Sequence, residues 1–442
     1  MSPERQVLGN EKPCCFDVLL PELIDNILFQ IDSPNALINF ITTSRFIHRC
    51  YQNRRDHLIV RLLQNELGPV LTDAKFLTIC PYAVPGTDRR EEWLAYWDGI
   101  HTIAAVYVDM LGGRGRDGAG RDVVPSFTEL TRLCRTHKDM SFLASTYVTV
   151  QLRSFGNEGP ATAPPSRAEQ LRVLRAFYRR QIVCNAWASA KRPSTYWLVH
   201  DMAAISNPSG RRGVRPGLCA AFKPWELWQI DHADQFLVRL CVALCLAAEE
   251  VAQPIDEAGF SDIFSHADLL VQYAREHPGI MDAALGALLS LPRLPSRTFQ
   301  DTAPVYYGYA ERYALPCLGL SWQAHLSVRL PGTAIHQGEQ QQQQEISGGG
   351  VTTVNFVGHV ADITPFGWVD MLGGRNLNRA GNAFIYSILS TPEPGGEEGE
   401  FARSRSFKLW KAAGFALWDQ RRIEALKELD RLRSLRTGWL VS

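Results

Sequence analysis

The sequence lacks the motifs that mark the common catalytic and nucleotide-binding sites. It has no H-E-x-x-H pair, no G-x-S-x-G nucleophile elbow and no G-x-x-x-x-G-K-[ST] phosphate loop. Its 10 cysteines include no C-x-x-C pair, and such a scatter is typical of reduced thiols. We therefore expect a protein that is not an enzyme and that binds neither a cofactor nor a metal ion.

Long apolar runs and an excess of one charge are absent as well. The longest apolar run, Leu240–Ala248, is far shorter than the ~20 residues that span a bilayer. Lys plus Arg number 46 and Asp plus Glu number 46, so no net charge attracts the chain to nucleic acid. The N-terminal MSPERQVLGNEKP has no apolar stretch of the secretory kind. These features predict a cytoplasmic or nuclear protein with no membrane and no nucleic-acid partner.

Helical patterns recur along most of the chain, and several begin with a capping box, in which two side chains bond each other's backbone N–H groups. Three pairs have its spacing: Asp88 with Glu91, Ser126 with Glu129, and Ser166 with Glu169. A long helix is predicted from Pro224 to about Glu250. Further helices are predicted at 262–275, 280–290 and 302–314, and two more between 406 and 436, divided near Trp418-Asp419.

Strand signals are few. Residues 147–152, the neighbours of Val199 and residues 351–360 are rich in β-branched side chains, but the chain shows no series of evenly spaced short strands. We predict a mainly α fold, with a helical module at 16–60 and a large, irregular, all-helical domain at 61–442. Five consecutive glutamines within 332–350 predict a disordered Gln/Gly-rich insertion in that domain.

The heptapeptide VDMLGGR occurs twice, at 108–114 and 369–375, each time after an apolar, helix-like run. We interpret the copies as two equivalent helix ends. The first copy overlaps a G-x-G-x-x-G pattern at 113–118, which binds a dinucleotide when a strand precedes it and a helix comes after it. Here a helix-like run precedes the pattern and Pro125 lies soon after it. A polar loop is therefore the favoured interpretation, and a dinucleotide-binding enzyme is the alternative.

Three other groups of residues are candidate sites. Asp231, His232 and Asp234 predict a solvent-facing polar patch, because adjacent positions on a helix do not face each other. Cys241 and Cys245 share one helical face without a nearby His or carboxylate, so we expect buried thiols and not a metal site. Six tryptophans at helical spacing predict core packing, with a substrate groove as the alternative: Trp93, Trp97, Trp225, Trp228, Trp410 and Trp418.

The segment from Leu20 to Arg45 carries the strongest functional signal. Apolar residues at i, i+3, i+4 and i+7 predict an amphipathic helix that stops at Asp32. Ser33-Pro34 predicts the start of a second helix, since Ser caps free backbone N–H groups and Pro is tolerated at the first helical position. The apolar residues of this helical pair exceed what one small core needs, which favours a docking module.

These residues resemble the F-box. The resemblance rests on Leu-Pro-Glu at the first helix start, Ile-Leu one to two turns later, the Asp-Ser pair at the break, Leu37 and Phe40, and the closing Thr43-Ser44-Arg45. It covers about residues 16–60. The continuation of the chain is similar to the segment after the F-box in many fungal proteins of unassigned function.

The resemblance implies a substrate receptor that docks the Skp-type adaptor, and through it a cullin, of a cullin-RING ubiquitin ligase. The remaining helical domain would then hold an unknown protein substrate. The residues implied to meet the adaptor are Leu20, Pro21, Ile24, Ile27, Leu28, Ile31, Leu37 and Phe40. The alternative is a self-contained helical scaffold, without ligase association, whose N-terminal apolar stripe packs on its own body.

Overall fold

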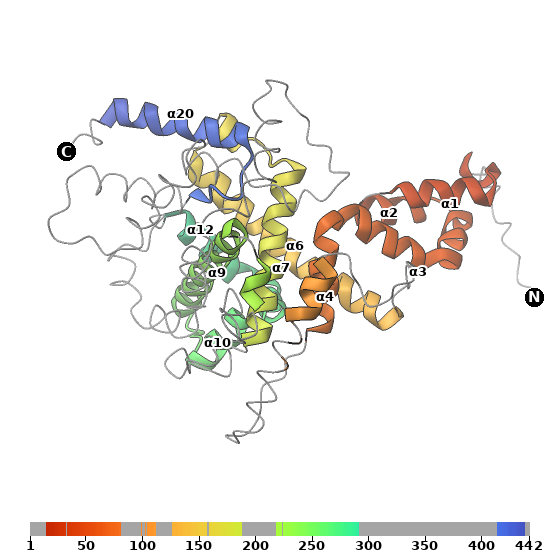
Figure 1. Ribbon diagram of the computed structural model, residues 1–442, viewed down its shortest axis with the longest axis horizontal. Helices are drawn as coiled ribbons and strands as arrows, with labels where there is room; N and C mark the ends of the chain where they lie inside the picture. The colour runs from red at the N-terminus through yellow and green to blue at the C-terminus, as the bar shows by residue number, and fades with distance from the viewer. Residues whose placement is uncertain are drawn as a thin grey trace, which may run out of the picture. The chain divides into compact units, whose positions relative to one another are not determined.

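The computed structural model describes residues 15–31, 33–80, 104–111, 126–156, 159–187, 218–222, 224–290 and 413–437, together with residues 99 and 102. Within these ranges most residues are helical and none lies in a β-strand, which confirms the prediction of a mainly α fold (Figure 1). The β-branched stretch at 147–152 lies inside a long helix, so its strand signal was misleading. Helix packing outweighs the weak intrinsic preference of such residues for strands.

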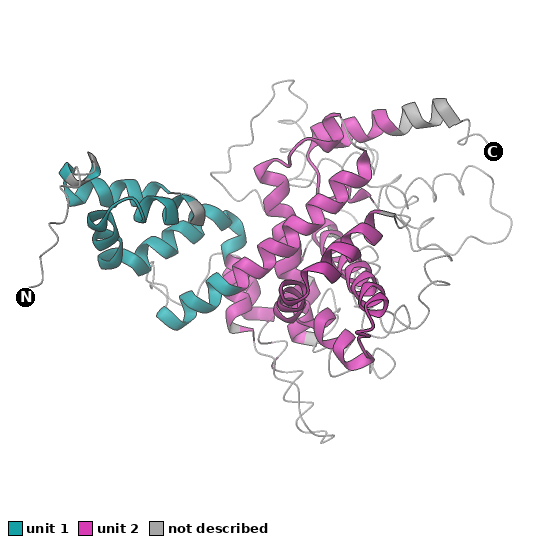
Figure 2. Ribbon diagram, turned by 180° about the vertical axis from the view of Figure 1, so that it is seen from behind, with its two compact units in different colours: residues 1–71, 119–135 teal, residues 72–118, 136–442 magenta. Residues whose placement is uncertain are grey.

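The chain divides into two compact units (Figure 2). Unit 1 comprises residues 1–71 and 119–135, and unit 2 comprises residues 72–118 and 136–442. The predicted module boundary at residue 60 falls inside a continuous helix that ends at Leu67. That helix continues because its apolar positions extend to Leu62, Leu63 and Leu67, all of which are buried.

Unit 1 is built on three helices: α1 (Pro21–Gln30), α2 (Pro34–Ile41) and α3 (Arg45–Leu67). Ser33 caps α2 by accepting a hydrogen bond from the Ala36 N–H at 3.2 Å, as the sequence predicts. Both α1 and α2 pack on α3. The short 3₁₀ helices η1 (Cys15–Val18) and η2 (Gly68–Val70) flank this group. Its buried core consists of Ile24, Leu28, Leu37, Ile47, Cys50, Leu58 and Leu62.

Unit 2 centres on two long helices, α7 (Arg167–Trp187) and α9 (Pro224–Glu250), which pack on each other. The bounds of α9 confirm the prediction for this segment. The remaining elements are α4 (Leu71–Ile79), α6 (Phe127–Phe155), η3 (Pro160–Thr162), η7 (Leu218–Ala221), α10 (Glu257–Ser265), α11 (Ala267–Glu276), α12 (Pro278–Ser290) and α20 (Gln420–Thr437). The first residues of α6 belong to unit 1.

Capping boxes start two of the long helices, as predicted. Ser126 and Glu129 exchange hydrogen bonds at the start of α6, where the Ser126 N–H donates to the Glu129 carboxylate at 2.7 Å. Ser166 and Glu169 do the same at the start of α7, with N–H to carboxylate and N–H to hydroxyl distances of 2.9 and 3.1 Å. Both helices therefore begin at the residue that the local sequence specifies.

Two helix predictions needed correction. The segment predicted as one helix over 262–275 forms two, because the chain leaves helical geometry at His266, between α10 and α11. At the C-terminus the break at Trp418-Asp419 is as predicted, but residues 414–417 form turns, so a preceding helix ends by Ala413, which is helical, and residues 406–412 lie outside the described ranges. Gly414 has φ +77°, which a right-handed helix does not allow.

Several predictions lie outside the described residues. They concern the capping box of Asp88 and Glu91, the helix at 302–314, the strand signals near Val199 and at 351–360, the Gln/Gly-rich insertion, the second VDMLGGR copy and the glycine-rich pattern at 113–118. Of the first VDMLGGR copy, Val108 to Leu111 are described, and they are helical. The run before the glycines is therefore a helix, as the polar-loop interpretation requires.

Candidate functional site

Helix α1 has two apolar faces, and only one of them serves the core of unit 1. Ile24 and Leu28 are buried against α3 and its neighbours. Leu20, just before the helix, together with Leu23 and Ile27 is exposed, with 65, 47 and 37% of the residue surface open. These three positions have an i, i+3, i+7 spacing and so form one line along the helix. We call Leu20, Leu23 and Ile27 the outer face of α1.

The eight residues implied to meet an adaptor fall into three groups. Leu20, Pro21 and Ile27 are exposed. Ile31 and Phe40 are partly buried and pack on the core of unit 1, where the Phe40 ring meets Phe16 edge to face at 5.3 Å. The three inside the core are Ile24, Leu28 and Leu37. These last three cannot touch a partner while unit 1 is folded, so their role is to hold α1 and α2 in place.

The set of residues implied to meet an adaptor omits three exposed apolar residues of unit 1. They are Val18, Leu23 and Ile38, with 78, 47 and 55% of the residue surface open. The signal was present, because the apolar stripe of the first helix is wider than one contact face. At 100° per residue, Leu20, Leu23 and Ile27 point to one side of the stripe and Ile24 and Leu28 to the other. The prediction treated the stripe as a single contact face, so it did not separate the exposed residues from the buried ones.

The described part of unit 2 holds a buried ionic cluster that joins three helices. On α7, Arg175 and Arg179 each direct their Nε at Asp73 of α4, at 3.0 and 2.9 Å. Nη1 of Arg179 lies 2.7 Å from the Glu226 carboxylate of α9. The hydroxyl of Tyr107 donates to the same Asp73 carboxylate. Every one of these residues is buried, so each charge depends on its partners for solvation.

The electrostatics of this cluster favour the charged form of Asp73 and the neutral form of Tyr107. Burial raises the pKa of Asp73, but the two guanidinium groups and the Tyr107 hydroxyl outweigh that effect, and the pKa ends below its ordinary value. Burial and the neighbouring Asp73 charge hold the pKa of Tyr107 well above its ordinary value. The cluster therefore contains the charged Asp73 carboxylate, the Glu226 carboxylate, two guanidinium groups and a neutral phenol.

A second buried ion pair corrects the prediction for Asp231, His232 and Asp234. Asp234 and His232 are buried instead of facing solvent, and Asp231 is partly exposed. The Asp234 carboxylate accepts from Nε of Arg180 at 2.9 Å, and Nη1 of Arg180 donates to the Phe264 carbonyl of α10 at 2.8 Å. Asp234 of the predicted patch thus fastens α9 to α7, and Arg180 in turn fastens α7 to α10.

The buried thiols match the sequence prediction. Cys241 and Cys245 lie in the core of α9, and burial raises the pKa of the Cys241 thiol to about 12. Among the described residues, no group of three or more His, Cys, Asp or Glu side chains has metal-binding geometry. Trp225, Trp228 and Trp418 are also buried, in keeping with predicted core packing.

Comparison with protein-family models, with curated proteins and with solved structures finds no match to this chain. No helix in the described ranges is long and apolar enough to cross a bilayer. The outer face of α1 is therefore the surface from which a function is best argued, since the ionic clusters are buried and internally paired.

Proposed function

We propose that this protein docks a partner through the outer face of α1, and that it belongs to the class of non-catalytic adaptor-binding receptors. More specifically, we propose an F-box-type substrate receptor. Unit 1 would bind the Skp-type adaptor of a cullin-RING ubiquitin ligase, and unit 2 would hold the protein substrate. Such a receptor works in the cytoplasm or the nucleus.

The observation that carries this proposal is the pair of apolar faces on one short helix. Ile24 and Leu28 supply the contribution of α1 to the core of unit 1, whereas Leu20, Leu23 and Ile27 are exposed outside that core. Exposed apolar side chains in a line lose contact with water when a partner covers them, and a few large ones carry most of the binding energy. The resemblance of Leu20 to Arg45 to the F-box supplies the identity of the partner.

The exposed apolar residues of unit 1 extend beyond the outer face of α1. Val18 and Leu20 have 78 and 65% of their surface open. An adjoining group of open apolar residues is characteristic of an interaction surface.

Co-purification with a Skp-type adaptor tests the proposal. The variant Leu23→Asp with Ile27→Asp places two charges on the outer face and leaves Ile24 and Leu28 in the core. We expect it to lose adaptor binding by at least tenfold while its helical circular dichroism stays unchanged. The matched control is Asn26→Asp with Gln30→Asp, since both residues are exposed on α1 and are polar to begin with.

We expect the control to bind the adaptor like the wild type. A wild-type protein that does not retain the adaptor would refute the proposal and favour the scaffold. Equal retention by the wild type and by the Leu23→Asp, Ile27→Asp variant would show that the outer face of α1 is not the docking surface.

A further inference from the structure

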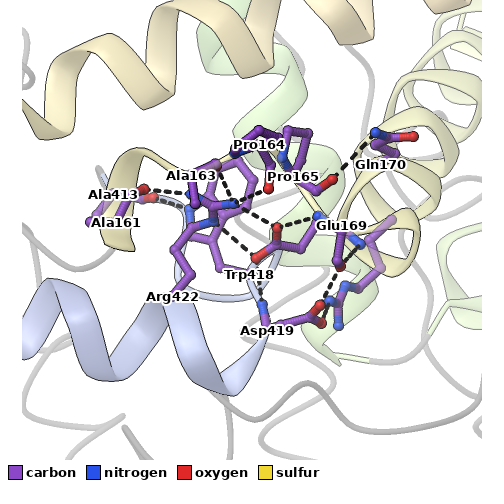
Figure 3. A network of polar contacts seen from close by, with 12 residues as sticks. Ala161, Ala163, Pro164, Pro165, Glu169, Gln170, Ala413, Trp418, Asp419 and Arg422 are labelled. Carbon is purple, nitrogen blue, oxygen red and sulfur yellow. Dashed lines mark hydrogen bonds and ion pairs between the residues drawn. The ribbon is translucent and has the colours of Figure 1, made fainter. Parts of the chain in front are cut away.

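Residues 413–429, here called the C-terminal segment, lie against helices that precede them by more than a hundred positions. Trp418 is fully buried between Tyr147 and Phe155 of α6, with ring centroids 6.2 and 6.1 Å away. Arg422 enters the turn before α7, where its guanidinium donates to the carbonyls of Ala161, Ala163 and Pro164 (Figure 3). The segment is thus held by one aromatic and one cationic side chain, four positions apart.

Polar groups of the preceding helices bind the segment through its backbone as well as its side chains. Glu169 of α7 accepts from the Asp419 N–H at 2.9 Å and from Nε and Nη2 of Arg422 at 3.0 and 2.9 Å. Gln229 of α9 donates to the Ala416 carbonyl at 2.7 Å. The Asp419 carboxylate accepts from the Ser166 hydroxyl and from Arg172. These contacts specify the order Trp-Asp-x-x-Arg.

The surface of α6, α7 and α9 that contacts the C-terminal segment is held in place by contacts that do not involve the segment. The capping box between Ser166 and Glu169 orients the Glu169 carboxylate without help from the segment. Tyr147 meets Phe236 edge to face at 5.2 Å, and Phe177 meets both of these rings at 6.1 Å. The walls around Trp418 are therefore fixed by α6, α7 and α9.

The segment is likewise organised locally. The Trp418 indole N–H donates to the Ala413 carbonyl at 2.6 Å, and the Leu417 N–H donates to the Gly414 carbonyl at 2.8 Å. The Asp419 carbonyl then accepts from the N–H groups of Arg422 and Ile423 at 3.0 Å, which starts α20. The turn that presents Trp418 and the helix that presents Arg422 thus arise from neighbouring residues.

We propose that unit 2 contains a peptide-binding site between α6, η3, α7 and α9, and that its resident ligand is the C-terminal segment of the same chain. The site binds a turn and the helix start after it, with the pattern Trp-Asp-x-x-Arg. The surface of α6, α7 and α9 and the C-terminal segment are each ordered by their own local contacts. The segment therefore binds as a ligand and does not need a covalent connection to residue 290. This inference does not depend on the docking surface of α1.

Cleavage of the full chain tests the proposal. A site-specific protease sequence with Gly-Ser flanks is inserted within Gln340–Gln344, where the sequence predicts an insertion, and the protein is cut under native conditions. We expect the C-terminal fragment to co-elute with the rest of the chain in size-exclusion chromatography. Separate elution of the wild-type fragment would overturn the proposal.

Two matched arginines test the specificity. Arg421 is exposed, whereas its neighbour Arg422 is buried in the site. After cleavage, we expect Arg421→Ala to retain the fragment and Arg422→Ala to weaken its retention by at least tenfold. Equal retention in the two variants would contradict the assignment of Arg422 as the specifying side chain.

A binding experiment with a free peptide tests the proposal even if the full-length Arg422→Ala variant does not fold. A fluorescent peptide of residues 411–430 is added in excess to the cleaved wild-type protein, and its binding is followed by anisotropy. We expect the peptide to bind and to displace the native fragment, while the same peptide with Arg422→Ala binds at least tenfold more weakly. Absence of binding by the unmodified peptide would overturn the proposal and make the segment an ordinary part of the core.

Discussion

Arg422 and Glu169 form a buried, two-pronged ion pair across 253 positions of the sequence. Nε of Arg422 lies 3.0 Å from one carboxylate oxygen and Nη2 lies 2.9 Å from the other (Figure 3). Two parallel N–H to oxygen hydrogen bonds of this kind fix the relative orientation of the two side chains and also strengthen the ion pair. Burial raises the pKa of Glu169, but these bonds, with those from the Asp419 and Ser166 N–H groups, bring it below its ordinary value. The carboxylate is therefore charged wherever unit 2 is folded at neutral pH.

Replacing this carboxylate tests its structural role. Glu169→Gln keeps the size of the side chain but leaves the Arg422 charge buried without a counter-ion, which costs about 3–5 kcal/mol of stability. Urea denaturation followed by circular dichroism measures the loss. Glu424→Gln is the control, because Glu424 is exposed on α20 and should change stability by less than about 0.5 kcal/mol. Similar losses in both variants would contradict the assignment.

Acid should destabilise the protein through Asp73. Its pKa in the folded protein lies below the ordinary value of 3.8, so the ion pairs stabilise the fold above about pH 4 and lose their effect as pH falls through the folded pKa. The free energy of unfolding should therefore decrease as the pH falls below about 4. Asp73→Asn should be less stable at pH 7 and less sensitive to acid. A pH slope identical to that of the wild type would refute this role.

Gly414 should not tolerate a side chain. Its φ of +77° strains any other residue, and a Cβ there would lie 2.8 Å from the Tyr147 hydroxyl. We expect Gly414→Ala to cost about 1–3 kcal/mol in thermal or urea unfolding. Adding Tyr147→Phe should recover the steric part of that loss but not the backbone part.

The control for Gly414 is Gly286→Ala, which lies inside α12 and has open space around the new methyl group. Alanine in a helix interior should stabilise the protein by about 0.5–1 kcal/mol. A loss at position 286 as large as that at position 414 would indicate that neither the φ angle nor the Tyr147 contact decides the outcome.

Two leucines on α1 should differ sharply in their effect on stability. Leu28→Ala removes a side chain that is 3% exposed and should cost about 2–5 kcal/mol. Leu23→Ala removes a side chain of the outer face that is 47% exposed. It should change stability by less than about 0.5 kcal/mol. Thermal unfolding of each variant, together with hydrogen exchange of the α1–α3 amides, separates the two. Equal losses would mean that the outer face also serves the fold.

Local patterns predicted the elements whose causes lie within a few residues. Both described capping boxes start helices where Ser126 and Ser166 specify them, and α9 extends over the predicted length. The break before α20 was also predicted, because its cause lies within a few residues of Trp418-Asp419. The division of 262–275 at His266 was not predicted, because no glycine or proline marks it.

The sequence by itself determined the helical class, the capped starts of α2, α6 and α7, and the apolar pattern of unit 1, because these depend on periodicity and on neighbours within a few positions. Only the tertiary structure decided which apolar face of α1 is buried, since that depends on where α3 packs. It also decided that Arg175, Arg179 and Arg180 lie inside the protein. Their partners are far away in the sequence, and a charge is stable in the interior only where folding brings an opposite charge within contact.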